Sequence, residues 1–94
     1  MSHEHVKFDC KSKLTSEEFI VSKNTLYLTK PSDEELRITF NLLVKSATHD
    51  GKAIDEDDVP RLIEFMIRSF RAERNIPRKQ RMFYCAEWID EFMK

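Results

Sequence analysis

The 94-residue chain contains a single glycine, Gly51. The P-loop and the dinucleotide-binding turn each need several glycines, because their backbones must approach a phosphate closely. The nucleophile elbow of α/β-hydrolases also needs glycines on both sides of its serine. The sequence therefore excludes these three architectures and the nucleotide-binding and hydrolytic functions that depend on them.

The length and composition suit one soluble globular domain over residues 1–94. Hydrophobic residues make up 40% of the chain, and charged residues reach 35%, above the usual ~25%. The 16 lysines and arginines nearly cancel the 17 acidic residues. The protein as a whole therefore has no strong field that would attract nucleic acid or a membrane surface.

The cysteines and the N-terminus indicate a reducing compartment. Cys10 and Cys85 lie far apart in the chain, and a secreted domain of this size usually has more disulfides. The N-terminal residues lack the apolar run of a signal peptide. No stretch approaches the roughly 18 apolar residues of a membrane span. We therefore expect a cytoplasmic protein with reduced, buried thiols and no membrane partner.

The first third of the chain mixes strand and helix signals. Residues 6–10 alternate apolar and charged side chains, the pattern of a short half-buried strand. Residues 25–29 are rich in β-forming side chains, so we expect a second strand there. Between them, Thr15 and Glu18 form a capping box that indicates a helix, but a Phe-Ile-Val triplet follows it. Residues 16–22 therefore stay open between helix and strand.

A second capping box, formed by Ser32 and Glu35, indicates the start of a longer helix. Most of its apolar residues fall on one helical face, but Ile38 and Leu42 fall on the other side, as in a helix that is central or engaged with a partner. Apolar residues over 38–44 also alternate as in a strand. The caps favour the helix, and the strand remains the competing interpretation. Asp50 and Gly51 are expected to end this element with a turn.

Two further helices are expected. Asp57 or Asp58 caps the first, Pro77 breaks it, and the second runs over residues 78–93. The core face of the first contains Val59, Leu62, Ile63, Met66 and Phe70. That of the second contains Met82, Cys85, Ala86, Ile89 and Met93. Together the elements predict an α+β fold, in which short N-terminal β strands or a hairpin pack against two or three C-terminal helices.

Aromatic and acidic side chains off these core faces are the candidate partner-binding residues: Tyr84, Trp88, Phe83, Phe65, Glu87 and Glu91. Tyr84 and Trp88 lie one helical turn apart on a stripe beside the core face. Large rings flanked by charge are typical of the centres of protein interfaces. A sheet packed over the helices would bury them instead, and the sequence leaves both outcomes open.

Six basic residues fall within fourteen positions: Arg68, Arg71, Arg74, Arg78, Lys79 and Arg81. Such a run, close to Phe83 and Tyr84, is able to hold phosphates and stack a base. Nucleic-acid binding by residues 68–81 is therefore the alternative function. The simpler interpretation of the run is a solvated helix face followed by a loop.

Candidate metal ligands are sparse. His3, His5 and Cys10 lack a fourth ligand at a regular spacing. The segment around Gly51 superficially resembles an EF-hand loop but has too few carboxylates to hold calcium well. We therefore expect no metal, no cofactor and no catalytic residues.

These observations favour a non-enzymatic small protein-binding module. The absence of catalytic motifs and the excess of apolar helix faces predict that it docks on another protein and modulates it, or pairs with itself as a homodimer. Small stand-alone proteins of this kind are common among bacteriophage and mobile-element accessory proteins, and we expect a similar accessory role.

Overall fold

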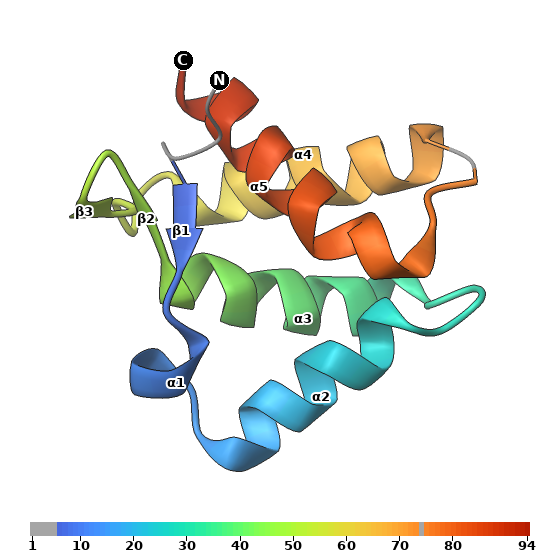
Figure 1. Ribbon diagram of the computed structural model, residues 1–94. Helices are drawn as coiled ribbons and strands as arrows, with labels where there is room; N and C mark the ends of the chain where they lie inside the picture. The colour runs from blue at the N-terminus through green and yellow to red at the C-terminus, as the bar shows by residue number, and fades with distance from the viewer. Residues whose placement is uncertain (1–5, 74) are drawn as a thin grey trace.

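The computed structural model describes residues 6–73 and 75–94. Within them the elements run β1 (Val6–Phe8), α1 (Cys10–Lys13), α2 (Ser16–Leu26), α3 (Asp33–Ser46), β2 (Ala47–His49), β3 (Lys52–Ala53), α4 (Val59–Ala72), the 3-10 helix η1 (Arg78–Gln80) and α5 (Arg81–Met93) (Figure 1). This arrangement confirms the α+β fold class. His3, His5 and Arg74 lie outside the described residues.

Helix α3 lies across the middle of the molecule, with α2 on one side and α4 and α5 on the other (Figure 1). The antiparallel sheet, in the order β1-β2-β3, lies at one end of the helices. Strand β1 also contacts α5, and α1 contacts α3. The short strands thus close one end of a helical layer.

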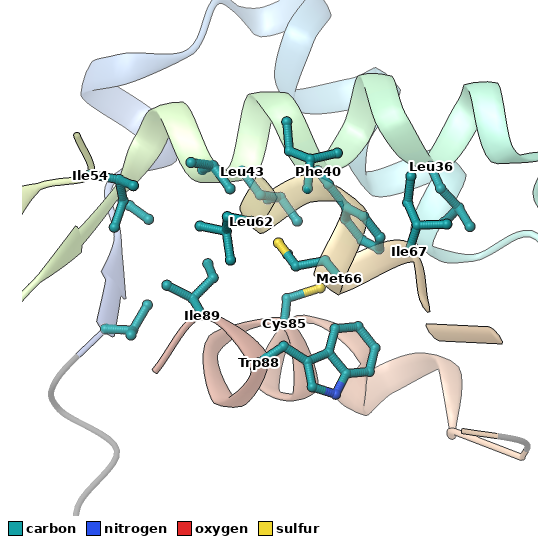
Figure 2. Packing of buried hydrophobic residues seen from close by; sticks show 14 of the residues in the cluster. Leu36, Phe40, Leu43, Ile54, Leu62, Met66, Ile67, Cys85, Trp88 and Ile89 are labelled. Atoms are coloured by element: carbon teal, nitrogen blue, oxygen red, sulfur yellow. The ribbon is translucent and has the colours of Figure 1, made fainter. Parts of the chain in front are cut away.

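The hydrophobic core lies between α3, α4 and α5 (Figure 2). Phe40 and Leu43 of α3, Leu62 and Met66 of α4, and Ile89 of α5 are all completely buried. The spacing of three residues in α3 and of four residues in α4 directs each pair to one helical face. The predicted core faces of the two C-terminal helices are therefore correct in their central residues.

Both predicted capping boxes are present. The Ser32 hydroxyl accepts a hydrogen bond from the backbone N–H of Glu35 at 3.1 Å, and the Glu35 carboxylate accepts one from Ser32 at 2.8 Å. Thr15 and Glu18 make the same pair of bonds at 3.1 and 2.9 Å. Each box satisfies two amides at a helix start. Both stretches that the sequence left open are accordingly helical.

The predicted strand at residues 25–29 is wrong. Its first two residues complete α2, and the chain then turns toward α3. The backbone carbonyls of Leu26 and Leu28 accept hydrogen bonds from Nη1 of Arg81 at 2.8 and 2.6 Å. A side chain distant in sequence thus satisfies carbonyls left over at the helix end. The local preference for strand gives way to this tertiary contact.

Asp50 and Gly51 form the turn of the β2–β3 hairpin, in which His49 pairs with Lys52. Both turn residues have positive φ, 55° and 83°, as a two-residue type I′ turn requires. A turn was expected here directly after the helix, but β2 lies between them. The two strands are too short to display alternation in the sequence.

Asp58 occupies the N-cap position of α4, one of the two predicted positions, but its side chain makes no capping hydrogen bond. Its carboxylate instead accepts a hydrogen bond from Arg61 at 2.7 Å. Pro60 lies in the first turn of α4, where its missing N–H has no helical partner to lose.

Candidate protein-binding surface

Trp88 belongs to the core of the protein. Its side chain is 6% exposed, and its ring meets Phe40 of α3 and Phe70 of α4 edge to face, with centroids 6.3 and 6.4 Å apart. Figure 2 shows the indole beneath the α3 and α4 side chains. The prediction that Trp88 lies on an exposed stripe is wrong, because these two helices enclose the ring. Trp88 therefore does not anchor a surface.

The other candidate partner-binding residues differ in how far they are buried. Phe65 is half-buried against Phe92, with ring centroids 5.7 Å apart. Tyr84 is half-buried, with its ring 6.2 Å from that of Trp88. The exposed stripe of α5 consists of Phe83, Glu87 and Glu91. Of the three aromatic rings on α5 among these candidates, Phe83, at 47% exposed, is therefore the one that reaches solvent most freely.

Two cations of the basic run hold neighbouring segments together. Arg71 of α4 donates a hydrogen bond to the carboxylate of Asp33 at 3.0 Å and another to the carbonyl of Pro31 at 3.0 Å. Arg78 donates to the Thr29 hydroxyl at 2.7 Å. The exposed members of the described run also include Arg68 and Lys79. Asp33 neutralises part of the run, which weakens it as a phosphate-binding surface.

Among the described residues of the basic run, Arg81 is the buried one, at 8% exposed. In addition to its two carbonyl partners, its guanidinium lies over the ring of Phe70, 5.2 Å from the centroid. Desolvation lowers the pKa of Arg81, and the nearby charge of Arg78 lowers it further. These contacts indicate that Arg81 stabilises the fold, because a guanidinium bonded to backbone carbonyls is not available to bind a phosphate.

An open groove of about 200 Å³ lies between α2 and the segment formed by η1 and the start of α5. The side chains that form its apolar walls are Cys10, Phe19, Leu26, Tyr27, Leu43 and Met82. Three cations, Lys23, Arg78 and Lys79, also line it. Among the described lining residues none carries a carboxylate. The groove is thus apolar inside and positive at its edge.

Exposed apolar side chains extend beyond the groove. Tyr27, in its wall, is exposed, and so is the adjacent Leu28. Phe83 follows directly after the groove residue Met82. The exposed ring of Tyr27 enlarges the apolar surface of the groove itself, and contiguous apolar surface on a small protein is typical of a binding site.

Helix α2 buries two polar side chains beside Leu26 and exposes three apolar ones. Ser22 and Thr25 are buried, whereas Ile20 is 53% exposed and its neighbours Phe19 and Val21 are also exposed. The Ser22 hydroxyl donates to the backbone carbonyl one turn earlier at 3.0 Å, which removes the cost of burying it. The three exposed apolar residues therefore lie outside the hydrophobic core.

The sequence reasoning missed this surface because residues 16–22 had no assigned conformation. The available signal was the capping box at Thr15. Counting 3.6 residues per turn from that start places Ile20 on the side opposite Ser22 and Thr25. The groove had no such signal, because its two sides come from segments about fifty residues apart in the chain.

The two cysteines are both free, as expected. Cys85 is buried in α5, and desolvation raises the pKa of its thiol to about 12. Cys10 is half-buried and lines the groove, with its Sγ 3.7 Å from the Ser46 hydroxyl. The expectation that both thiols are buried therefore holds fully for Cys85 and in part for Cys10.

Comparison of the chain with models of protein families, with curated proteins and with solved structures found no match. Within the described residues, no helix has both the length and the apolar character needed to cross a membrane.

Proposed function

We propose that the protein is a non-enzymatic cytoplasmic binding module that docks on another protein through the groove between α2 and η1. The supporting observation is an open apolar groove lined at its edge by three cations. Apolar walls gain free energy when a partner displaces water from them, at about 25 cal/mol per Å². The proposal keeps the binding role predicted from the sequence but moves it from the Trp88 stripe to this groove.

The charge around the groove selects the chemistry of the partner. Lys23, Arg78 and Lys79 favour acidic residues, while the walls formed by Phe19 and Met82 favour an apolar anchor. The matching partner is a protein segment with apolar side chains flanked by aspartate or glutamate. Charge complementarity at the rim would set orientation and association rate, and the apolar contact would supply most of the affinity.

Nucleic-acid binding by residues 68–81 receives less support. Arg71 is paired with Asp33, and Arg81 is bonded to backbone carbonyls. A phosphate-binding surface needs several cations that are free to face the backbone of the nucleic acid.

A charge-reversal pair tests the proposed site. We expect Lys79→Glu to abolish capture of a partner from lysate of the organism that encodes the protein. Arg68→Glu makes the same charge change on the exposed face of α4 and should leave capture unchanged. The captured protein is then purified, and its dissociation constant is measured with the three forms. Equal affinities for all three would refute the groove as the site.

Cys10 provides a direct reporter of occupancy. Because it lines the groove and Cys85 is buried, a thiol reagent should modify Cys10 first. Saturating amounts of the purified partner should slow this modification at least about tenfold, since the partner covers the groove. An unchanged rate in the presence of bound partner would place the interface elsewhere.

Binding assays with labelled single- and double-stranded oligonucleotides test the alternative function, nucleic-acid binding by residues 68–81. We expect no binding tighter than the non-specific range of about 10⁻⁴–10⁻⁶ M at 0.15 M salt. Tight binding that falls steeply with salt, and that Arg68→Gln weakens, would favour the nucleic-acid function over the groove proposal.

A further inference from the structure

The outer side of α2 is a ridge formed by Ser16, Glu17, Ile20, Lys23 and Asn24. All five residues are exposed, and the buried residues of the helix lie on its opposite side. At the centre of this α2 ridge is Ile20, the most exposed of the large apolar side chains. An exposed apolar residue at the centre of a polar ridge has the layout of a small interface, with an apolar middle and a polar rim.

The charges of the α2 ridge are arranged symmetrically. Glu17 and Lys23 lie three residues before and three residues after Ile20, and Ser16 and Asn24 lie four residues before and after it. When two such helices run antiparallel and cross at Ile20, each Glu17 comes level with Lys23 of the other helix, which lies across the contact within reach of these long side chains. The same crossing sets each Ser16 opposite an Asn24. The ridge is therefore complementary to itself under a twofold rotation, which is the requirement for an isologous dimer.

We infer that the α2 ridge pairs with a second copy of this chain in an antiparallel homodimer. Val21, next to Ile20 in the chain and also exposed, adds apolar surface to the contact. The parallel arrangement would set the two Glu17 side chains against each other and likewise the two Lys23 side chains, and like charges repel. The inference goes beyond the proposed function, since the ridge is the outer side of α2 and the groove is its flank. Lys23 stands at the boundary between the two.

The size of the ridge sets the expected strength of the dimer. An eleven-residue helix is about 16 Å long at 1.5 Å per residue. A contact of that length buries less than the standard interface of about 1,600 Å². The dimer should therefore be weak, with a dissociation constant on the order of micromolar to tens of micromolar.

Sedimentation equilibrium from about 5 to about 500 µM tests the inference. The wild-type protein should shift from monomer to dimer across this range. Ile20→Glu should weaken the dimer about thirtyfold or more, as expected for a central interface residue. Ile38→Glu makes a similar change at an exposed position of α3 and should leave the dimer unchanged. Thermal unfolding of each variant verifies that it is folded.

A charge swap tests the antiparallel register. Glu17→Lys and Lys23→Glu should each weaken the dimer about tenfold, because each creates two repulsive contacts. The double variant should return to within about threefold of wild type, because both ion pairs are restored in reverse. A wild-type protein that stays monomeric, or a double variant no better than the single ones, would overturn the inference. Both results are independent of the Lys79→Glu test of the groove.

Discussion

Helices α2 and α5 both carry large apolar residues beyond those of one core face. In α5 the largest of these residues is buried, whereas in α2 they are exposed. Helix α5 lies against α4 and near α3, so its Trp88 is enclosed between Phe40 and Phe70. Helix α2 packs on α3 from the other side, and the outer side that carries Ile20 is exposed. The same kind of residue is thus core in one helix and surface in the other. The number of neighbours, rather than hydrophobicity, decides which residues are available to a partner.

The comparison predicts its largest effect for Trp88→Ala. Removing the indole leaves a cavity lined by rings, which should cost about 3–5 kcal/mol of unfolding free energy. Ile20→Ala should change the stability of the dilute monomer by no more than about 0.5 kcal/mol, because the side chain is exposed. Urea unfolding at low protein concentration measures both. Similar losses for the two variants would mean that α2 is enclosed as firmly as α5.

The second prediction concerns the link between these helices. Arg81→Met removes the guanidinium that binds the carbonyls of Leu26 and Leu28, and it should cost about 2–4 kcal/mol, since charge-assisted hydrogen bonds are lost at a buried site. Arg68→Met, at an exposed position, should cost less than about 0.5 kcal/mol. Urea unfolding of both variants and of the wild-type protein measures these losses of unfolding free energy. Amide hydrogen exchange after the end of α2 should quicken in Arg81→Met alone.

Smaller effects are expected at the two capping boxes. Thr15→Ala and Ser32→Ala each remove a side-chain acceptor at a helix start and should cost about 1 kcal/mol. The loss at Thr15 should be more local, because α2 contributes less to the core than α3 does. Hydrogen exchange should therefore quicken mainly in α2. A uniform increase across the protein would show that α2 unfolds together with the core.

The smallest effect at neutral pH is expected from Cys85→Val. Burial raises the pKa of the native thiol to about 12 from its ordinary value of 9.0, so the folded state favours the protonated form. This contribution to stability is complete below pH 9.0 and is lost as the pH rises toward about 12. Unfolding free energies measured above pH 9.0 should fall less steeply for Cys85→Val than for wild type. If the unfolding free energies of the two proteins fall equally with pH, the Cys85 thiol does not contribute to the pH dependence of stability.

Local signals in the sequence were sufficient for most helix starts. Thr15 and Ser32 each bond an amide three residues ahead, so the information lies within one turn of chain. The spacing of apolar residues likewise predicted the buried faces around Leu62 and Ile89. The error at residues 25–29 has a different origin, because the contacts of Leu26 and Leu28 with Arg81 cross more than fifty residues of sequence.

The two candidate surfaces also differ in whether they depend on residues close together in the sequence or on contacts distant in sequence. The charges around Ile20 and the capping box at Thr15 are present in the sequence, but the α2 ridge was not predicted, because residues 16–22 were left open between helix and strand. The groove required the tertiary structure, because Phe19 of α2 and Met82 of α5 line one groove only in the folded chain. By itself the sequence excluded the glycine-rich phosphate-binding turns and located helix caps and apolar helix faces. All of these features depend on residues within a few positions of each other. The tertiary structure decided which apolar residues are exposed, because exposure depends on which elements pack over each face.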